Sequence, residues 1–147
     1  MKALALLLLG TLTGNELAVS AFVHPTISRL SDDKHAASAQ GLARIYGKYA
    51  PFWYLATIIS QIVLAWRTPS GESEKPLFVV SAALMLAALG LTIVGEVPIN
   101  NRVCNWNLDE LPANWKAERS QWDKLHAIRV AILFGALIAL ALGATRK

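Results

Sequence analysis

The sequence predicts an all-α integral membrane protein, a four-transmembrane-helix bundle that forms a single domain over residues 1–147. The first observation is composition, because 54% of the residues are hydrophobic and 16% are charged, whereas a soluble domain carries about 25% charged residues. The second is a set of four apolar runs, each near the roughly 20 residues that a spanning helix needs. The runs cover residues 3–23, 51–66, 77–97 and 125–144.

The first run, residues 3–23, also has features of a secretory signal. Lys2 precedes a leucine stretch, and the segment "AVSA" has the small residues of a cleavage site. The run is longer than a usual signal core, so we interpret it as the first spanning helix.

The connection between the first two spans has a helical pattern of its own. Ser31 followed by Asp32 and Asp33 is a good helix start, with the acids at the positive end of the helix dipole. Apolar and aromatic residues then recur at helical spacing up to Tyr49. These features predict a short amphipathic interfacial helix on the membrane surface. Four tryptophans near the span ends, Trp53, Trp66, Trp106 and Trp115, are expected to be interfacial anchors.

Several function classes lack their signatures, since the sequence has no phosphate-binding loop, zinc-ligand spacing or acyl-transfer triad. Cys104 is the only cysteine, which rules out an intramolecular disulfide. The formal net charge of +4 does not indicate nucleic acid, because Lys and Arg flank apolar helices instead of forming a solvent-facing stripe. The pattern favours a lipid bilayer containing anionic lipids as the partner.

An even number of spans places both termini on one side of the membrane. We call the opposite end of the bundle, where residues 24–50 and 98–124 connect the spans, the loop end. Polar residues that are far apart in sequence are expected to meet there at one depth: His24, Glu96, Asn100, Trp122, His126 and Arg129.

Helical spacing supports this convergence. Trp122, His126 and Arg129 are separated by four and three residues, so they share one helical face. Glu96 lies two residues before Pro98, whose missing amide predicts a kink or helix end that lines a cavity.

Asn15 and Glu16 lie deeper, about 12 Å below His24 at a rise of about 1.5 Å per residue. An unpaired charge near the bilayer centre costs about 2.5 to 3.5 kcal/mol on insertion scales. Glu16 should therefore face the bundle interior, either in a structural pair with Arg129 or in a functional site. Asn15, Glu16 and Glu96 are the predicted substrate-pocket residues.

The segments "GNELAVSAFVHP", "PFW", "VPINNRV" and "WDKLHAIR" resemble the signature pieces of a family of small four-helix membrane proteins. That family includes fungal anthrone oxygenases and many bacterial members of unknown function. The likeness spans nearly the whole chain, and the pairing of "P-x-N" after the third span with "W-x-x-x-H-x-x-R" at the fourth is moderately specific. The resemblance implies the fold, an oxygenase-type activity, and a place in the family pattern for His24, Pro98, Asn100, Trp122, His126 and Arg129.

Two kinds of chemistry fit these residues. In the first, His24, His126, Glu16 and Glu96 hold copper or iron, since imidazole and carboxylate suit these metals and bundle cores commonly bind them. The missing "E-x-x-H" spacing and the depth difference between Glu16 and His24 argue against a two-iron centre and against a single compact shell.

The second chemistry needs no cofactor, because an anthrone-like carbon acid forms a stabilised carbanion that can react with oxygen itself. His126 or His24 would take the proton, and Asn100, Trp122 and Arg129 would hold the developing oxyanion.

The function we predict is a membrane-embedded, oxygenase-like enzyme acting on a small hydrophobic, aromatic substrate in a polar pocket near the loop end. The alternatives are a proton-coupled or small-molecule carrier using Glu16 and Arg129, and an assembly subunit. For the latter, or for a homo-oligomer, the small-residue segment "GALIALALGA" offers a close-packing surface. The loop end carries most of the Lys and Arg residues, which favours a cytoplasmic loop end.

Overall fold

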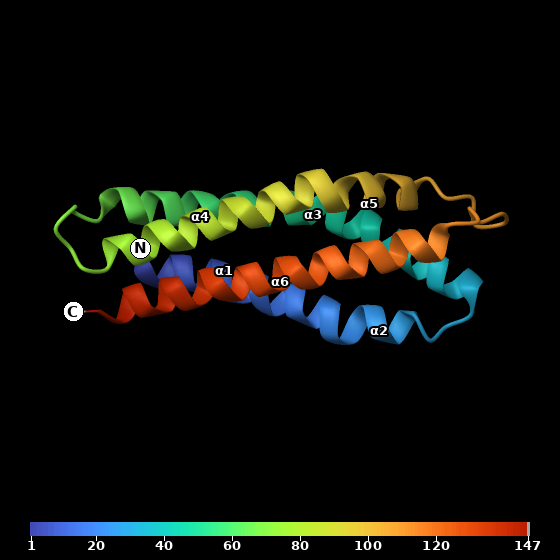
Figure 1. The fold of residues 1–147 in the computed structure, drawn as a ribbon, viewed down its shortest axis with the longest axis horizontal. Coiled ribbons are helices and arrows are strands. Elements are labelled where there is room, and N and C mark those ends of the chain that lie inside the picture. Colours follow the sequence, from blue (N-terminus) through green and yellow to red (C-terminus); the bar gives the residue numbers. More distant parts are fainter. Residues whose placement is uncertain (147) are drawn as a thin grey trace.

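The computed structural model describes residues 1–146, which form four long rods packed side by side (Figure 1). The first rod joins α1 (Lys2–Ala18), the π-helical turn η1 (Val19–Val23) and α2 (His24–Ile27); the second is α3 (Asp32–Arg67). The third joins α4 (Lys75–Leu91), the π-helical turn η2 (Thr92–Glu96) and α5 (Val97–Cys104); the fourth is α6 (Trp115–Thr145). Both chain ends lie at the end of the bundle opposite the loop end (Figure 1).

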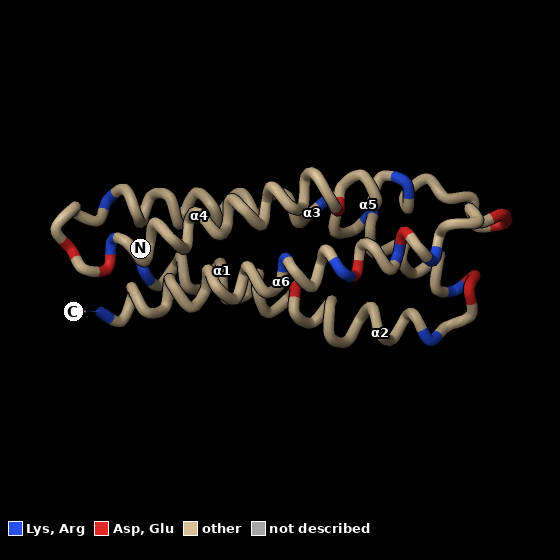
Figure 2. Tube along the Cα trace, viewed as in Figure 1, with Lys and Arg blue, Asp and Glu red and all other residues tan. Residues whose placement is uncertain are grey.

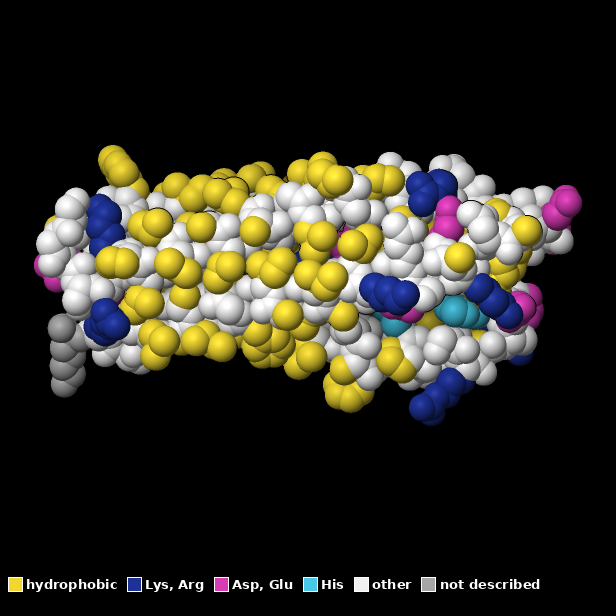
Figure 3. Space-filling view, in the orientation of Figure 1, with side chains coloured by type: hydrophobic (Ala, Val, Ile, Leu, Met, Phe, Trp, Pro, Cys, Tyr) yellow, Lys and Arg dark blue, Asp and Glu magenta, His cyan; other side chains and the backbone are white. Residues whose placement is uncertain are grey.

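All four rods are long and apolar enough to cross a membrane. Charged residues gather toward the two ends of the bundle, with few between them (Figure 2). Hydrophobic side chains are spread over the middle of the surface (Figure 3). Phe52 and Val94, for example, are 73% and 80% exposed. A broad exposed apolar band of this kind is the surface that lipid tails cover. The predicted four-helix membrane bundle is confirmed, and the four spans indicate a multi-pass membrane protein.

The segment predicted as a separate interfacial helix is the first half of α3, which runs unbroken through Pro51. The prediction of a helix lying on the membrane surface was therefore wrong. Ala36, Ala39 and Ala43 are buried, because this half of α3 packs into the bundle instead of lying flat. At about 1.5 Å per residue the helix is about 54 Å long, longer than the roughly 30 Å hydrocarbon core. Its first half therefore extends the bundle beyond the apolar band.

Small residues of α6 pack within the chain. A Cβ atom added to Gly143 would lie 2.6 Å from the Cε1 atom of Phe78 on α4, so only glycine permits this close crossing. Ala136, Ala139 and Leu140 are buried on the same side. Between apolar helices in lipid, close van der Waals packing of this kind is a main source of cohesion. This face of the "GALIALALGA" segment is thus occupied by α4.

Two π-helical turns interrupt the first and third rods just before a proline. The amide of His24 donates to the carbonyl of Val19, and the amide of Val97 donates to that of Thr92, each five residues back. Pro25 and Pro98 follow directly, and neither has an amide to donate. The third rod continues past Pro98 as α5, so the predicted helix end is absent, and the helix is widened by the π-helical turn before this proline. Such turns are frequent at functional sites.

Trp106 and Trp115 are 7% and 6% exposed and pack edge to face at 6.0 Å. They belong to a hydrophobic cluster at the loop end, so their prediction as interfacial anchors was wrong. The reason is that the connection between α5 and α6 folds back onto the start of α3, where the Gln40 side chain donates to the carbonyls of Val103 and Trp106 at 3.1 and 3.0 Å. Trp66, in contrast, is 78% exposed, as an anchor would be.

Candidate active site

One face of α6 carries the polar residues that point into the bundle. Arg119, Trp122, His126 and Arg129 recur at spacings of three, four and three residues, and all four are buried. This spacing keeps them on the inner face of the helix. The face predicted from Trp122 onward is therefore confirmed, and it continues one turn further back to Arg119.

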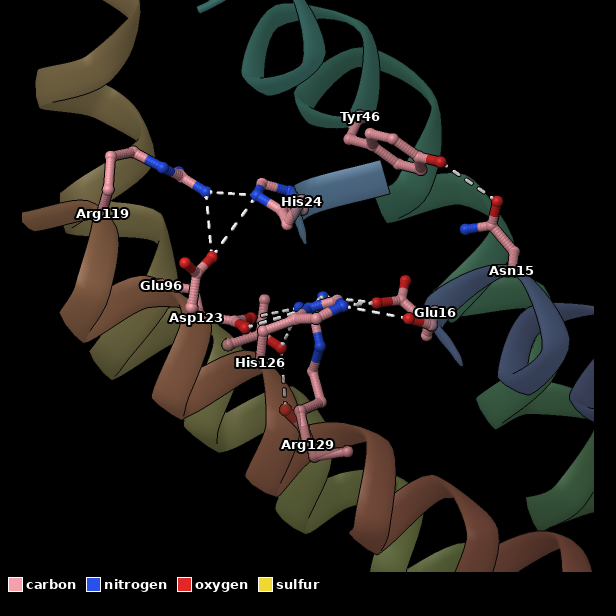
Figure 4. Close-up of polar contacts among 11 residues, drawn as sticks. Asn15, Glu16, His24, Tyr46, Glu96, Arg119, Asp123, His126 and Arg129 are labelled. Atoms are coloured by element: carbon pink, nitrogen blue, oxygen red, sulfur yellow. Dashed lines mark hydrogen bonds and ion pairs between the residues drawn. The ribbon is translucent and has the colours of Figure 1, made fainter. Parts of the chain in front are cut away.

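Arg129 is the centre of a buried ionic cluster that joins three rods (Figure 4). Its Nη2 atom donates to the Oε2 atom of Glu16 on α1 at 2.5 Å. Its Nη1 atom donates to the carboxylate of Glu96 and, at 3.0 Å, to the hydroxyl of Thr92. A guanidinium that binds two carboxylates in this way keeps their charges inside the bundle. Of the two alternatives considered for Glu16, the pair with Arg129 is present in the structure.

His126 completes the cluster with both ring nitrogens engaged. Its Nε2 atom lies 3.1 Å from the backbone carbonyl of Glu16, and its Nδ1 atom lies 2.8 Å from Nη2 of Arg129. Because arginine only donates, Nδ1 is the acceptor and Nε2 carries the proton. The cluster thus joins two acidic side chains, one guanidinium and one imidazole.

A second layer lies nearer the loop end. The Nη2 atom of Arg119 lies 2.6 Å from Nδ1 of His24 and 3.2 Å from Oδ1 of Asp123. The indole ring of Trp122 stacks on both histidines, with ring centroids 4.6 Å from His24 and 4.5 Å from His126. Trp122 therefore connects this layer to the ionic cluster through aromatic contacts.

A cavity of about 600 Å³ adjoins the cluster. That volume falls within the range of about 300 to 1,000 Å³ that is usual for small-molecule sites. Its polar wall holds Glu16, His24, Asn100, Trp122, His126 and Arg129. The rest of the wall is largely apolar and comes mainly from α3 and from the third rod, for example Leu42, Ala43, Ile58, Leu89 and Ile93.

Two predicted pocket residues, Glu96 and Asn15, are not among the residues that line the cavity. Glu96 is 0% exposed and lies behind Arg129, so it acts on the site through the guanidinium. Asn15 accepts a hydrogen bond of 3.1 Å from the hydroxyl of Tyr46 and points away from the ionic cluster (Figure 4). Asn100 lines the cavity as expected.

The four predicted metal ligands do not converge on one cation position. Glu16 and Glu96 both face the guanidinium of Arg129, and the Nδ1 atom of His126 faces the same positive group. His24 instead meets Arg119. Within residues 1–146, no group of three or more His, Cys, Asp or Glu side chains is placed to hold a metal ion. The donor set as arranged does not fit a metal, and we derive no chemical step through one.

Sequence reasoning missed three residues of the site, Arg119, Tyr54 and Thr92, and also Asp123, which contacts Arg119 outside the large cavity. Arg119 had a usable signal, because it lies seven residues before His126 on the same helical face. Tyr54 had none. It is 4% exposed, lines the cavity, and its hydroxyl has no hydrogen-bond partner among the described residues.

Comparison with known proteins identifies one family. The family model described as anthrone oxygenase matches residues 42–139, a range that includes Glu96, Asn100, Trp122, His126 and Arg129 and follows Glu16 and His24. No curated protein and no solved structure matches the chain. Because the matched range covers more than half of the 147 residues, the chain belongs to the anthrone oxygenase family.

Proposed function

We propose that this protein is a membrane-embedded, oxygenase-like enzyme that oxidises a small, hydrophobic, aromatic carbon acid. The observation that carries the proposal is a largely apolar cavity with a buried ionic cluster in its wall. Family membership supports the same class of reaction. A fold alone does not specify a substrate, so the proposal rests on what the cavity and its polar wall can do.

The reaction removes a proton from an acidic CH₂ group flanked by aromatic rings and adds molecular oxygen to the carbanion. The peroxide that forms takes up the proton and then loses water to give a ketone. Overall, R₂CH₂ and O₂ give R₂C=O and H₂O, with four electrons passing from carbon to oxygen. Both substrate protons end in the water molecule, so no proton is released.

Glu16 and His126 are the pair that takes the proton in this proposal. The carboxylate of Glu16 lines the cavity, and its contacts with His126 and Arg129 run through Oε2, which leaves Oε1 for the substrate. The Nδ1 atom of His126 lies 3.5 Å from Oε2, and it can take the proton once its hydrogen bond from Arg129 breaks. Arg129 holds this pair in place.

The same wall has donors for the oxyanion that forms on the substrate. The indole Nε1 of Trp122 and the hydroxyl of Tyr54 are buried and have no partner among the described residues. Because His24 accepts from Arg119 at Nδ1, its Nε2 atom carries the proton and can donate. Donors directed at a developing negative charge commonly contribute more than any other term to such catalysis. Asn100, on the same wall, is a further candidate donor.

Oxygen consumption by the purified protein in mild detergent, with anthrone as the probe, tests the proposal. Removing a positioned acid–base group usually costs about 10² to 10⁴ in rate, so His126→Gln should lose activity on that scale. His35→Gln is the matched control, because His35 packs on Trp115 outside the cavity. Full activity in His126→Gln, at unchanged folding, would show that the site is assigned wrongly.

A carrier remains the second candidate, favoured by the buried Glu16–Arg129 pair beside a cavity in a membrane bundle. Charged pairs inside membrane bundles often mark proton or ion pathways. Uptake of the probe into liposomes driven by a pH gradient, without oxygen consumption, would support this function over oxygenation.

We also propose that the loop end faces the cytoplasm, which the excess of Lys and Arg residues near it supports. Because both termini lie at the opposite end (Figure 1), a C-terminal alkaline phosphatase fusion in a bacterial host should be active. An inactive phosphatase with a fluorescent C-terminal green fluorescent protein fusion would reverse the orientation.

A further inference from the structure

A second, smaller cavity of about 320 Å³ lies between the first rod and α6. Its wall is formed by Ser20, His24, Pro25, Ser28, Asp123 and His126. His24 and His126 also line the large cavity. The two imidazoles therefore form a partition between two cavities, with Trp122 stacked against both of them.

The two cavities have different surroundings. The large cavity is bounded by Leu55, Ile93 and Val97, which are 56%, 56% and 38% exposed on the apolar surface between α3 and the third rod. The small cavity includes two serines and Asp123, whose side chain is 48% exposed. Histidine side chains are visible near the loop end, next to charged residues and beyond most of the apolar band (Figure 3). The large cavity thus borders the exposed apolar surface, and the small one borders the exposed Asp123 side chain near the loop end.

Polar contacts lead from the ionic cluster to this surface. Oε2 of Glu16 lies 3.5 Å from Nδ1 of His126, and Nδ1 of His24 lies 3.4 Å from Oδ1 of Asp123. Both Nδ1 atoms accept a hydrogen bond from an arginine, so a proton crosses either contact only after that hydrogen bond breaks. The ring centroids of the two histidines are 6.3 Å apart, and both residues line the small cavity. The exposed carboxylate of Asp123 ends the path, beside the guanidinium of Arg119.

We propose that the small cavity is an aqueous port, which admits water to the partition of His24 and His126 and exchanges protons between it and the bulk phase at the loop end. The organic substrate uses the separate, lipid-facing cavity. Exit of product water through this port rests on the proposed function, whereas access of water to the partition does not. The separation keeps bulk water away from the carbanion and still gives the histidines contact with solvent.

Thiol accessibility tests the port without any substrate. In a Cys104→Ala background, Ser20→Cys is placed in the port and Ala21→Cys on the adjacent exposed surface of the same turn. A small, charged, membrane-impermeant methanethiosulfonate reagent is applied to protein in liposomes. The reagent reacts only with the thiolate, which forms less readily in apolar surroundings. We therefore expect Ser20→Cys to react at least about tenfold faster than Ala21→Cys. Equal rates, or an unreactive Ser20→Cys in a folded protein, would overturn the port.

A second measurement uses the proton path and does not depend on a cysteine at position 20. In D₂O under argon, the wild-type protein should catalyse deuterium incorporation at the acidic carbon of anthrone. Asp123→Asn should slow this exchange several-fold while reducing aerobic oxygen consumption much less, because oxidation returns the substrate protons to oxygen. Asp109→Asn, in the exposed connection before α6, is the control.

Unaltered exchange in Asp123→Asn, or an equal loss of exchange and oxidation, would contradict the port. A wild-type protein that neither exchanges deuterium nor consumes oxygen would contradict the proposed function instead. In that case the thiol measurement alone would decide whether water reaches the partition.

Discussion

The guanidinium of Arg129 lies 2.5 Å from the carboxylate of Glu16 across 113 residues of sequence. This contact links α6 to α1 at the depth of the large cavity, and the contact of the same guanidinium with Glu96 adds the third rod. A single side chain therefore neutralises part of the charge of two buried acids and holds three rods in register. Stability and function are expected to depend on it in different ways.

Replacing Arg129 alone should destabilise the protein strongly. Arg129→Met leaves Glu16 and Glu96 buried without their partner, and breaking a buried ion pair in this way costs about 3 to 5 kcal/mol. The triple variant Glu16→Gln, Glu96→Gln and Arg129→Met should recover most of that stability and remain inactive. Thermal unfolding in detergent, followed by circular dichroism, measures the stability of the single and the triple variant. Arg67→Met is the control, because Arg67 is exposed. If Arg129→Met were as stable as the wild type, the cluster would contribute little to folding.

Tyr54→Phe should lower activity without lowering stability. The Tyr54 hydroxyl is buried without a partner, and an unsatisfied buried polar group costs about 1 to 3 kcal/mol. Removing the hydroxyl should therefore leave stability unchanged or raise it, while kcat falls if this group holds the substrate oxyanion. Comparison of the unfolding midpoint with kcat and KM tests the point. Unchanged kcat would remove Tyr54 from the proposed oxyanion donors.

Narrowing the large cavity should affect substrate binding before it affects the fold. Ala43 lies in the cavity wall on α3 and is 8% exposed, so Ala43→Phe directs a ring into open space. We expect KM to rise more for a three-ring probe such as anthrone than for a one-ring analogue. If Ala43→Phe left the KM of both probes at the wild-type value, the substrate would have to bind elsewhere.

Metal content separates the two chemistries considered for the site. Because Arg129 lies between the two carboxylates, we expect less than one equivalent of copper or iron and no dependence of metal content on His126. Mass spectrometry of protein purified without chelators, wild type beside His126→Ala, makes the measurement. Stoichiometric metal that disappears in His126→Ala would show that the cluster rearranges to bind it.

Replacing Gly143 should weaken the crossing of α4 and α6 far from the site. The added Cβ atom of Gly143→Ala would meet the Phe78 ring at 2.6 Å, and overpacking of this kind costs about 1 to 3 kcal/mol. The unfolding midpoint should fall while KM for the probe stays near the wild-type value. Gly10→Ala, which meets no atom within 4 Å, is the matched control and should not be destabilised.

The four spans and the polar face of α6 could be predicted from sequence because both are local properties. Span length follows from the apolar run that lipid requires, and the shared face of Trp122, His126 and Arg129 follows from the helical repeat. The separate surface helix was wrongly predicted for a related reason. An amphipathic pattern is the same whether its apolar side meets lipid or, as for Ala36 and Ala43, the rest of the bundle.

Sequence alone thus determined which residues must leave the lipid, at roughly what depth, and near which end of the bundle. Only the tertiary structure decided that Arg129 binds both Glu16 and Glu96, that Glu96 lies behind this guanidinium, and that His24 and His126 separate two cavities. These relations depend on the rotation and axial shift of each rod against its neighbours. Packing between helices, such as the close approach of Gly143 to Phe78, and the two π-helical turns set those quantities, and no repeat along a single helix encodes them.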